Sequence, residues 1–254
     1  MTKQPPARHL AASTATALAL ACSIAFAGDP AAGNADGTAA AEEREILRSI
    51  VNQSRAAVKS EDIAVRLDGQ PTLGDAGAVL TLIEFSDLQC GYCRRHLLSV
   101  LPVLRERYVS TGQVRYAFFD FPVDQRHPEA RGAAVAVRCA ADQNVFEPMR
   151  VRLYAHPAEL QQENLPRHAE ALGLDGTRFS VCLADGSKAE AVNRDVALGA
   201  QLRVRGTPTF LLGYSNGQYV RVARRIVGAQ PLEVFESAIQ ALLAEPQGSM
   251  AQAH

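Results

Sequence analysis

The sequence predicts an α/β fold in which a central mixed sheet is flanked by helices, with a helical insertion between the two β halves. Three observations predict it. Residues 79–119 have the pattern of a strand, a helix and a second strand. Residues 128–202 are helical in pattern almost throughout, and residues 209–243 return to a β-hairpin followed by a helix. A single sheet interrupted by a block of helices accommodates this order.

The first β half is a strand–helix–strand unit. Turn residues at 69–71 and 73–77 precede a short apolar run over residues 79–85, which is typical of a buried strand. One helix is expected over about residues 92–109, and residues 114–119 alternate as the second strand. The two strands are therefore expected to run parallel, joined by a right-handed crossover.

Turn and breaker residues divide the rest of the chain. Prolines such as Pro148 are expected to split the helical insertion, about residues 126–203, into short helices. Asn216-Gly217 lies between two strand-like runs and is a strong hairpin signal. Pro231 suits the first position of a helix, which is expected to run to about residue 243.

The most informative motif is Cys90-Gly91-Tyr92-Cys93, where the first strand gives way to the helix. At a helix N-terminus, unsatisfied backbone N–H groups and the helix dipole favour a thiolate over a thiol. We therefore expect Cys90 to be an exposed nucleophile and Cys93, one turn further in, to be its buried partner in disulfide exchange. A C-x-x-C can also be half of a zinc site, or an inert structural pair. No second C-x-x-C accompanies this one, so redox chemistry is the favoured interpretation.

Residues 1–27 resemble a secretory signal. A modestly basic start precedes an uncharged stretch rich in Ala and Leu, and residues 25–27 match a small-x-small cleavage site. We expect cleavage after Ala27 and a periplasmic location. A short membrane anchor and a lipid-modified Cys22 are the alternatives.

Removal of that segment would leave an even number of cysteines in an exported protein, where disulfides persist. If Cys90 pairs with Cys93, the remaining pair is Cys139 with Cys182. A bond between them would add about 4 kcal/mol to the free energy of unfolding in the chain-entropy account. Two buried free thiols are the alternative.

Residues 28–62 are expected to hold a linker and then an amphipathic helix. Apolar residues recur at helical spacing over residues 42–59, and this stripe packs either on its own domain or on a second subunit. Homo-oligomerisation depends on that choice. The main domain is expected over residues 63–246, and residues 247–254 form a polar tail that we expect to be disordered.

The composition argues against some classes of binding partner. The chain has 26 basic and 27 acidic side chains, a formal net charge of −1, which gives no support for nucleic acid or an acidic membrane as the main partner. No motif predicts a cofactor or a metal centre. His127, His156 and His168 lack matching ligands along the chain and are interpreted as structural or surface residues.

A second landmark, Thr207-Pro208, begins the returning β segment. Proline cannot donate to a sheet ladder, so it lies at an edge, an end or a bend, and by itself it indicates a turn. Together, the cysteine motif and this distant proline resemble the thioredoxin superfamily, and the helical insertion resembles its DsbA-like branch. The resemblance covers about residues 67–243. Further matches, in the same order, lie at residues 82–87, 119–122, 138–140, 206–210 and 228–231.

The resemblance implies how substrate is bound. In this family the peptide before the proline is cis and lies against the cysteine pair. A cis Thr207-Pro208 would leave the Thr207 backbone free to bind an extended substrate as an added strand, beside Gly91 and Tyr92. Some relatives also carry a disulfide at the positions of Cys139 and Cys182.

The resemblance also assigns Glu84 to a buried acid position, from which it could relay a proton to or from Cys93 through water. A partly exposed glutamate at a sheet edge is the alternative. Arg94, Arg95 and His96, in the first turns of the helix, either assist the thiolate or form a solvated cationic face.

The leading functional hypothesis is an exported thiol–disulfide oxidoreductase that oxidises substrate proteins and is reoxidised by a membrane partner of the DsbB type. A disulfide isomerase or reductase is the first alternative, because Gly91-Tyr92 and Thr207 resemble that branch more closely. Isomerases typically oligomerise, and here only residues 42–59 could mediate it. A copper or zinc chaperone using Cys90 and Cys93 is a third hypothesis.

Overall fold

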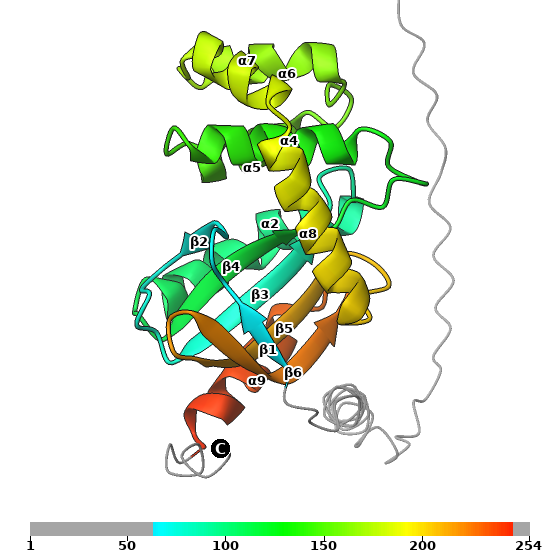
Figure 1. Ribbon diagram of the computed structural model, residues 1–254. Helices are drawn as coiled ribbons and strands as arrows, with labels where there is room; N and C mark the ends of the chain where they lie inside the picture. Colours follow the sequence, from blue (N-terminus) through cyan, green and yellow to red (C-terminus); the bar gives the residue numbers. More distant parts are fainter. Residues whose placement is uncertain (1–62, 246–254) are drawn as a thin grey trace, which may run out of the picture. The chain divides into compact units, whose positions relative to one another are not determined.

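A six-stranded sheet lies at the centre of the computed structural model, which describes residues 63–245 (Figure 1). The strand order is β1-β6-β5-β3-β4-β2. Strands β3 (Leu80–Ser86) and β4 (Val114–Asp120) are parallel, as predicted, and the other neighbouring pairs are antiparallel. The predicted mixed sheet is confirmed. The expected signal segment, linker, amphipathic helix and polar tail lie outside the described residues.

Strand β3 is buried along its whole length because helices cover both faces of the sheet. Leu80 and Leu82 belong to the hydrophobic cluster on one face, whereas Ile83 and Phe85 belong to the cluster on the other. A short, continuous apolar run is the pattern expected of a strand in this position. The strand ends at Ser86, shortly before the cysteine motif.

The helix expected over residues 92–109 is broken into three pieces, so that prediction was wrong in detail. Helix α2 (Gly91–Ser99) ends at Val100, and α3 (Leu101–Leu104) is followed by the π-helical turn η1 (Arg105–Val109). Pro102 has no N–H to continue α2, but it fits the first turn of α3, where an N–H would have no intrahelical acceptor.

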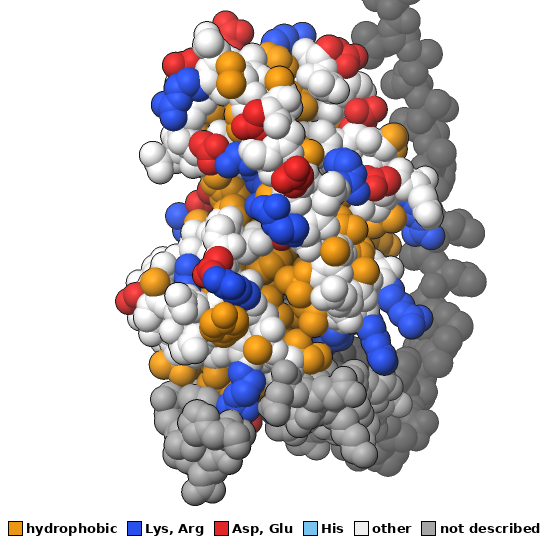
Figure 2. Space-filling view, in the orientation of Figure 1, with side chains coloured by type: hydrophobic (Ala, Val, Ile, Leu, Met, Phe, Trp, Pro, Cys, Tyr) orange, Lys and Arg blue, Asp and Glu red, His pale blue; other side chains and the backbone are white. Residues whose placement is uncertain are grey.

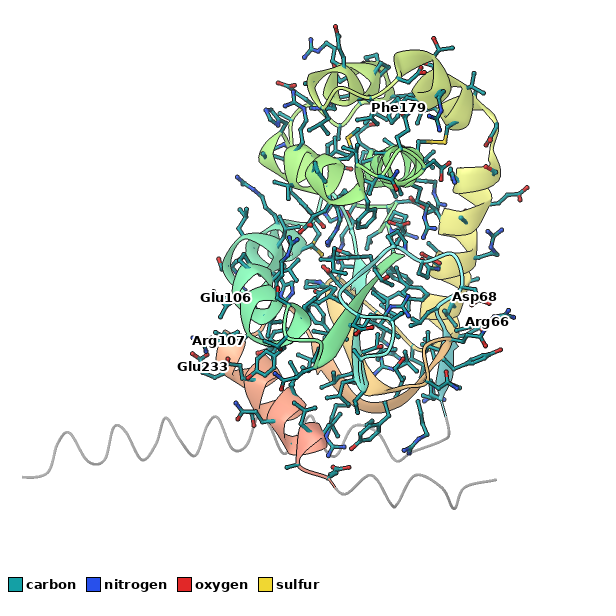
Figure 3. All side chains as sticks on the ribbon, turned by 90° about the vertical axis from the view of Figure 1, so that its left-hand side faces the viewer. Arg66, Asp68, Glu106, Arg107, Phe179 and Glu233 are labelled. Carbon is teal, nitrogen blue, oxygen red and sulfur yellow. A yellow bond between two sulfur atoms is a disulfide. The ribbon has the colours of Figure 1, made fainter. Side chains whose placement is uncertain are left out.

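The helical insertion lies between β4 and β5, as predicted (Figure 1). Pro148 does not divide two helices, as was expected, but lies in the first turn of α5, where its missing N–H leaves no hydrogen bond unmade. Phe179 is fully buried among these helices (Figure 3). The helices are α4 (Ala130–Ala141), α5 (Phe146–Ala155), the 3₁₀ turn η2 (Gln162–Asn164), α6 (Leu165–Ala171), α7 (Gly176–Ala184) and α8 (Ser187–Gln201).

A disulfide joins Cys139 on α4 to Cys182 on α7, and it appears as the yellow sulfur–sulfur bond among the upper helices in Figure 3. Helix α8 returns from the insertion to the sheet, where Leu198 packs with the cluster around Phe85. The insertion is therefore braced internally by a covalent bond and anchored to the sheet by apolar contact. No helix among residues 63–245 is long and apolar enough to cross a membrane.

The second β half is a hairpin followed by a helix. Strands β5 (Thr209–Ser215) and β6 (Tyr219–Val227) meet at Gly217, whose positive φ of 91° suits glycine. Helix α9 (Leu232–Leu243) follows, with Pro231 as its N-cap. Two short strands, β1 (Ala64–Arg66) and β2 (Thr72–Leu73), were not predicted and pair with β6 and β4 at the sheet edges.

Candidate active site

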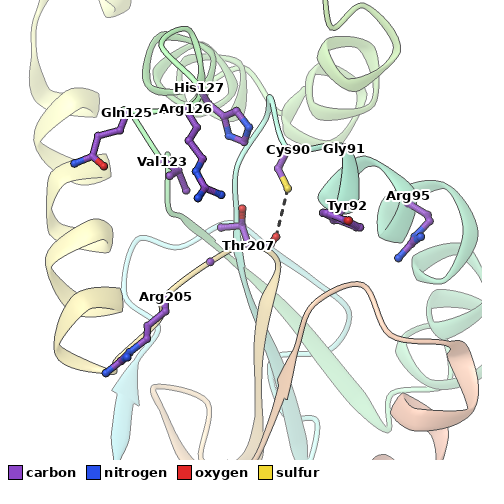
Figure 4. A pocket seen from close by; sticks show the side chains of 11 residues that line it. Cys90, Gly91, Tyr92, Arg95, Val123, Gln125, Arg126, His127, Arg205 and Thr207 are labelled. Atoms are coloured by element: carbon purple, nitrogen blue, oxygen red, sulfur yellow. Dashed lines mark hydrogen bonds between the residues drawn. The ribbon is translucent and has the colours of Figure 1, made fainter.

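Cys90 is the N-cap residue of α2, and Cys93 lies in the first turn of that helix. Both are free thiols in this structure. Cys93 is fully buried, and Cys90 is only 6% exposed, so the expectation of an exposed Cys90 was wrong. The Cys90 side chain nevertheless lines a cavity of about 770 Å³ (Figure 4), which gives a substrate sulfur a route to it.

Thr207 lies directly opposite Cys90, although 117 positions separate them in the sequence. When it is protonated, the Cys90 thiol donates to the Thr207 carbonyl oxygen, which lies 3.3 Å from Sγ; the contact is the dashed line in Figure 4. The peptide bond between Thr207 and Pro208 is cis. Gly91 and Tyr92 line the same cavity, and Tyr92 is 62% exposed. The structure thus brings together the cysteine motif and the proline loop.

The two thiols have opposite acidities. Hydrogen bonding with the Cys93 thiol is the largest cause that lowers the pKa of Cys90 to about 5. Partial burial opposes it, and hydrogen bonds from the Thr207 side chain and from backbone N–H groups add to it. Burial raises the pKa of Cys93 well above its ordinary value, and the neighbouring Cys90 and the charge of Glu84 raise it further. At neutral pH, Cys90 is therefore the thiolate and Cys93 the thiol.

Glu84 is fully buried on β3, so the alternative of a partly exposed glutamate was wrong. Arg150, from α5 of the insertion, forms a 2.8 Å ion pair with its carboxylate. The Tyr116 and Ser86 hydroxyls donate to the carboxylate at 3.0 and 2.8 Å. Burial raises the pKa of Glu84, but the charge of Arg150 and the other contacts outweigh it, so that the pKa lies below its ordinary value. This environment suits a fixed negative charge, and the proton relay stays a prediction.

The three basic residues of α2 have different environments. Arg94 and Arg95 are exposed, whereas His96 is fully buried. The His96 ring packs against Phe210 and Phe235, with centroid distances of 4.5 and 5.1 Å. Burial lowers the pKa of His96 to about 4, so it is neutral at pH 7 and adds no positive charge to the thiolate site.

Comparison with known proteins identifies this arrangement. A family model described as Thioredoxin matches residues 66–227, which is more than half of the chain. The chain belongs to the thioredoxin family. Its CxxC pair, Cys90 and Cys93, lies at the start of α2 within the matched residues.

Solved structures share the DsbA-like form of the thioredoxin fold. Wolbachia pipientis alpha-DsbA1 superposes with a TM-score of 0.62 at 24% identity, over 70% of this chain and 92% of that one. BdbD from Bacillus subtilis has a TM-score of 0.56 at 19% identity, over 73% of this chain and 100% of that one. The predicted thioredoxin-like fold with a helical insertion is confirmed.

Curated relatives include longer proteins. The Na(+)/H(+) antiporter NhaA 3 of Salinispora tropica is 34% identical over 196 residues, which are 76% of this chain but 28% of that protein. The chain thus spans about a quarter of the length of the antiporters it matches. A probable disulfide bond formation protein D of Bacillus anthracis is 27% identical over 161 residues, covering 58% of this chain and 70% of that protein.

Within this thioredoxin-family site, sequence reasoning missed the role of Asp87 and His127. The buried Asp87 carboxylate accepts from the Val123 backbone N–H at 2.7 Å and lies 2.8 Å from His127 Nδ1. It thereby holds the loop that follows β4 as a wall of the cavity, of which His127 is part. The only signal was an acid directly after a buried strand.

No group of three His, Cys, Asp or Glu side chains in residues 63–245 could hold a metal ion.

Proposed function

We propose that the chain is an exported oxidase that introduces disulfides into substrate proteins. The observation that carries the proposal is the placement of the two sulfurs: Cys90 lines the cavity at the N-terminus of α2, and Cys93 is buried behind it. This placement lowers the pKa of Cys90 to about 5 and raises that of Cys93. Stabilising the thiolate stabilises the reduced pair, and this makes the disulfide form more oxidising. The nucleophilic cysteine has a pKa of about 7 in thioredoxin, a reductant, and about 3.5 in DsbA, an oxidant. The pKa of Cys90 lies between these two values.

The reaction begins with the Cys90–Cys93 disulfide. A substrate thiolate attacks Cys90 Sγ, forms a mixed disulfide and releases Cys93 as a thiolate, which takes up a proton. A second substrate thiolate attacks the substrate sulfur of the mixed disulfide, and Cys90 leaves as a thiolate. The substrate loses two electrons and two protons. The cysteine pair gains both electrons and one proton, and the other proton goes to solvent.

The acidities of the two thiols favour this direction. Cys90 is a good leaving group because its thiolate is stable at neutral pH. Cys93, which is buried and stays a thiol, attacks the mixed disulfide slowly and leaves time for the second substrate sulfur. An extended substrate in the cavity would pair with the backbone of Thr207, whose carbonyl lies 3.3 Å from Cys90 Sγ.

Export and a periplasmic location are part of the proposal. The Cys139–Cys182 disulfide supports an oxidising compartment, since structural disulfides are rare in the cytosol. The secretory pattern of residues 1–27 supports the same location. A membrane oxidase of the DsbB type would then restore the Cys90–Cys93 disulfide.

Redox equilibration with glutathione, combined with oxidation of a reduced, unfolded substrate protein, tests the proposal. We expect the oxidised chain to oxidise the substrate stoichiometrically. We also expect its equilibrium constant with glutathione to be closer to that of an oxidase such as DsbA than to that of thioredoxin. A pair that stays oxidised in equilibrium with a strongly reducing glutathione buffer would contradict it.

The isomerase alternative rests on Gly91-Tyr92 and Thr207, and refolding of a scrambled disulfide substrate distinguishes it. An isomerase would rescue the scrambled substrate and would sediment as a dimer or trimer that dissociates when residues 28–62 are deleted. A monomer that oxidises thiols but leaves scrambled disulfides unchanged supports the oxidase.

A further inference from the structure

The active-site cavity carries a local excess of positive charge. Among residues 63–245, eleven line it; three are the arginines Arg95, Arg126 and Arg205, and none is Asp or Glu. The chain as a whole is nearly balanced, with 26 basic and 27 acidic side chains. On the face of the molecule in Figure 2, basic and acidic side chains are interspersed. The arginines therefore distinguish the cavity from that surface.

The three arginines lie on both sides of the reactive sulfur (Figure 4). Arg126 extends toward Thr207 on one side, with Arg205 further from Cys90 on the same side, and Arg95 lies on the opposite side of Cys90. An extended chain advances about 3.3 Å per residue, so a bound peptide would bring residues on either side of its cysteine near these cations.

Arg95 is held in place by two contacts. Its guanidinium lies 5.2 Å from the centre of the Tyr92 ring, and it donates to the Ala229 carbonyl oxygen at 3.1 Å. Neither partner is an anion, so no acidic side chain of residues 63–245 compensates the charge of Arg95 beside the exposed ring. This side of the cavity therefore offers an incoming peptide a flat apolar surface and a fixed cation.

Arg126 and Arg205 are exposed and form no ion pair within residues 63–245. The acid nearest to Arg126 in the sequence, Asp124, is paired with Arg131 at 2.6 Å. The leading causes of the low pKa of Cys90 are hydrogen bonds, not these arginines. Within the described part of the chain, the two cations therefore have no acidic partner and can meet one on a bound substrate.

We propose that this cavity selects substrate segments that carry acidic side chains on both sides of the reacting cysteine. The inference rests on the proposed oxidation of substrate proteins and adds the substrate class. Exposed ion pairs are individually weak, so the preference should arise mainly from faster association, which salt suppresses. Charge complementarity with three arginines that form no ion pair in the described part of the chain carries the argument.

Three dithiol peptides that differ only in the residues flanking the cysteines, Asp, Ser or Lys, provide the test. Stopped-flow oxidation by the oxidised full chain should be about tenfold faster for the Asp peptide than for the Lys peptide at low ionic strength. The preference should shrink in about 1 M salt, where the Debye length is about 3 Å. In R126E/R205E it should reverse or disappear. Because flanking charges also change the thiol acidity of the peptide, the ratio of rates within each variant is compared between variants.

Arg178→Glu is the matched control, because Arg178 is exposed on α7 and does not line the cavity. It should keep the wild-type ratio. Equal ratios in the wild type and R126E/R205E would overturn the inference while leaving the proposed oxidase intact. Failure of the wild type to oxidise even the Ser peptide would reject the proposed function, and this inference with it.

Discussion

The two cysteine pairs of this chain have the same chemistry available but lie in different surroundings. Cys139 and Cys182 are bonded between two helices of the insertion, 43 residues apart in the sequence. Cys90 and Cys93 start a helix, and Cys90 lines a cavity where hydrogen bonds favour its thiolate. A thiolate that a second sulfur can reach exchanges, whereas a bond enclosed by packed helices persists. The surroundings of each pair, rather than the presence of two nearby cysteines, therefore decide whether the pair exchanges with substrate or stabilises the fold.

The largest expected effect comes from removing cysteine sulfurs from each pair separately and comparing the activities. Cys90→Ser should lower the rate of substrate oxidation by at least about 1,000-fold, because no other sulfur of residues 63–245 lines the cavity. C139A/C182A should keep most of the rate per folded molecule. Both are measured with the same reduced substrate protein. Substantial activity in Cys90→Ser, or loss of activity in folded C139A/C182A, would break the comparison.

The acidity of Cys90 predicts a pH dependence that only the reactive pair can produce. Its pKa is about 5 in the folded reduced chain, against an ordinary value of 9.0. Between these values the unfolded chain binds a proton that the folded chain does not. The free energy of unfolding of the reduced protein should therefore rise with pH, by up to about 1.4 kcal/mol per unit, and this gain is lost as pH falls toward 5.

The oxidised protein is the control for that measurement, because it has no Cys90 thiol to titrate. Denaturant unfolding of both forms from pH 5 to 9 gives two curves whose difference isolates the thiols. The raised pKa of Cys93 acts in the opposite sense, but only above pH 9, where its unfolded thiol ionises. Curves that run parallel between pH 5 and 9 would show that Cys90 is an ordinary thiol.

The bracing pair predicts a stability effect without a change in chemistry. C139A/C182A should lose about 4 kcal/mol of unfolding free energy, since the bond closes a loop of about 43 residues in the unfolded chain. Urea unfolding at neutral pH measures the loss. Reducing the wild type under conditions that open this disulfide should lower its stability by a similar amount, and a loss well below 1 kcal/mol would assign the bond no bracing role.

The sequence predicted the order of strands and helices because long apolar periods and turn residues are local signals. It did not predict β1 and β2, which have three and two residues and so are too short to show a period. The helix through Pro102 was expected to be continuous, since its apolar spacing continues across the break. Conversely, Pro148 has the residue type of a helix breaker, but a proline in the first turn of a helix costs no hydrogen bond.

The site shows the same limit. Cys90, Cys93 and Thr207 could be assigned because they form motifs, and the structure brings them together. The partner of Glu84, by contrast, is Arg150, 66 positions away on a helix of the insertion, and no spacing rule links a strand residue to it. The ion pair between them was therefore not predictable from either local pattern.

The ion pair between Glu84 and Arg150 links the sheet beside the reactive cysteines to the helical insertion that holds the Cys139–Cys182 bond. Breaking this ion pair gives the smallest of the predicted effects. Arg150→Met should lower the free energy of unfolding by about 3 kcal/mol at pH 7, because it leaves the buried carboxylate of Glu84 without a counter-charge. Burial would then raise the pKa of Glu84. A group whose folded pKa is raised loses stability as pH increases, so the loss should be smaller at pH 4 than at pH 7.

E84Q/R150M is the control, since it removes both charges together and should be more stable than Arg150→Met alone. The reactive pair responds as well: Glu84 raises the pKa of the Cys93 thiol through its charge, so E84Q/R150M should lower that pKa while the Cys139–Cys182 bond is unaffected. Ultraviolet absorbance of the Cys93 thiolate across pH, followed in a Cys90→Ser background, measures the shift. An unchanged Cys93 pKa would mean that the insertion braces the fold without influencing the sulfurs that react.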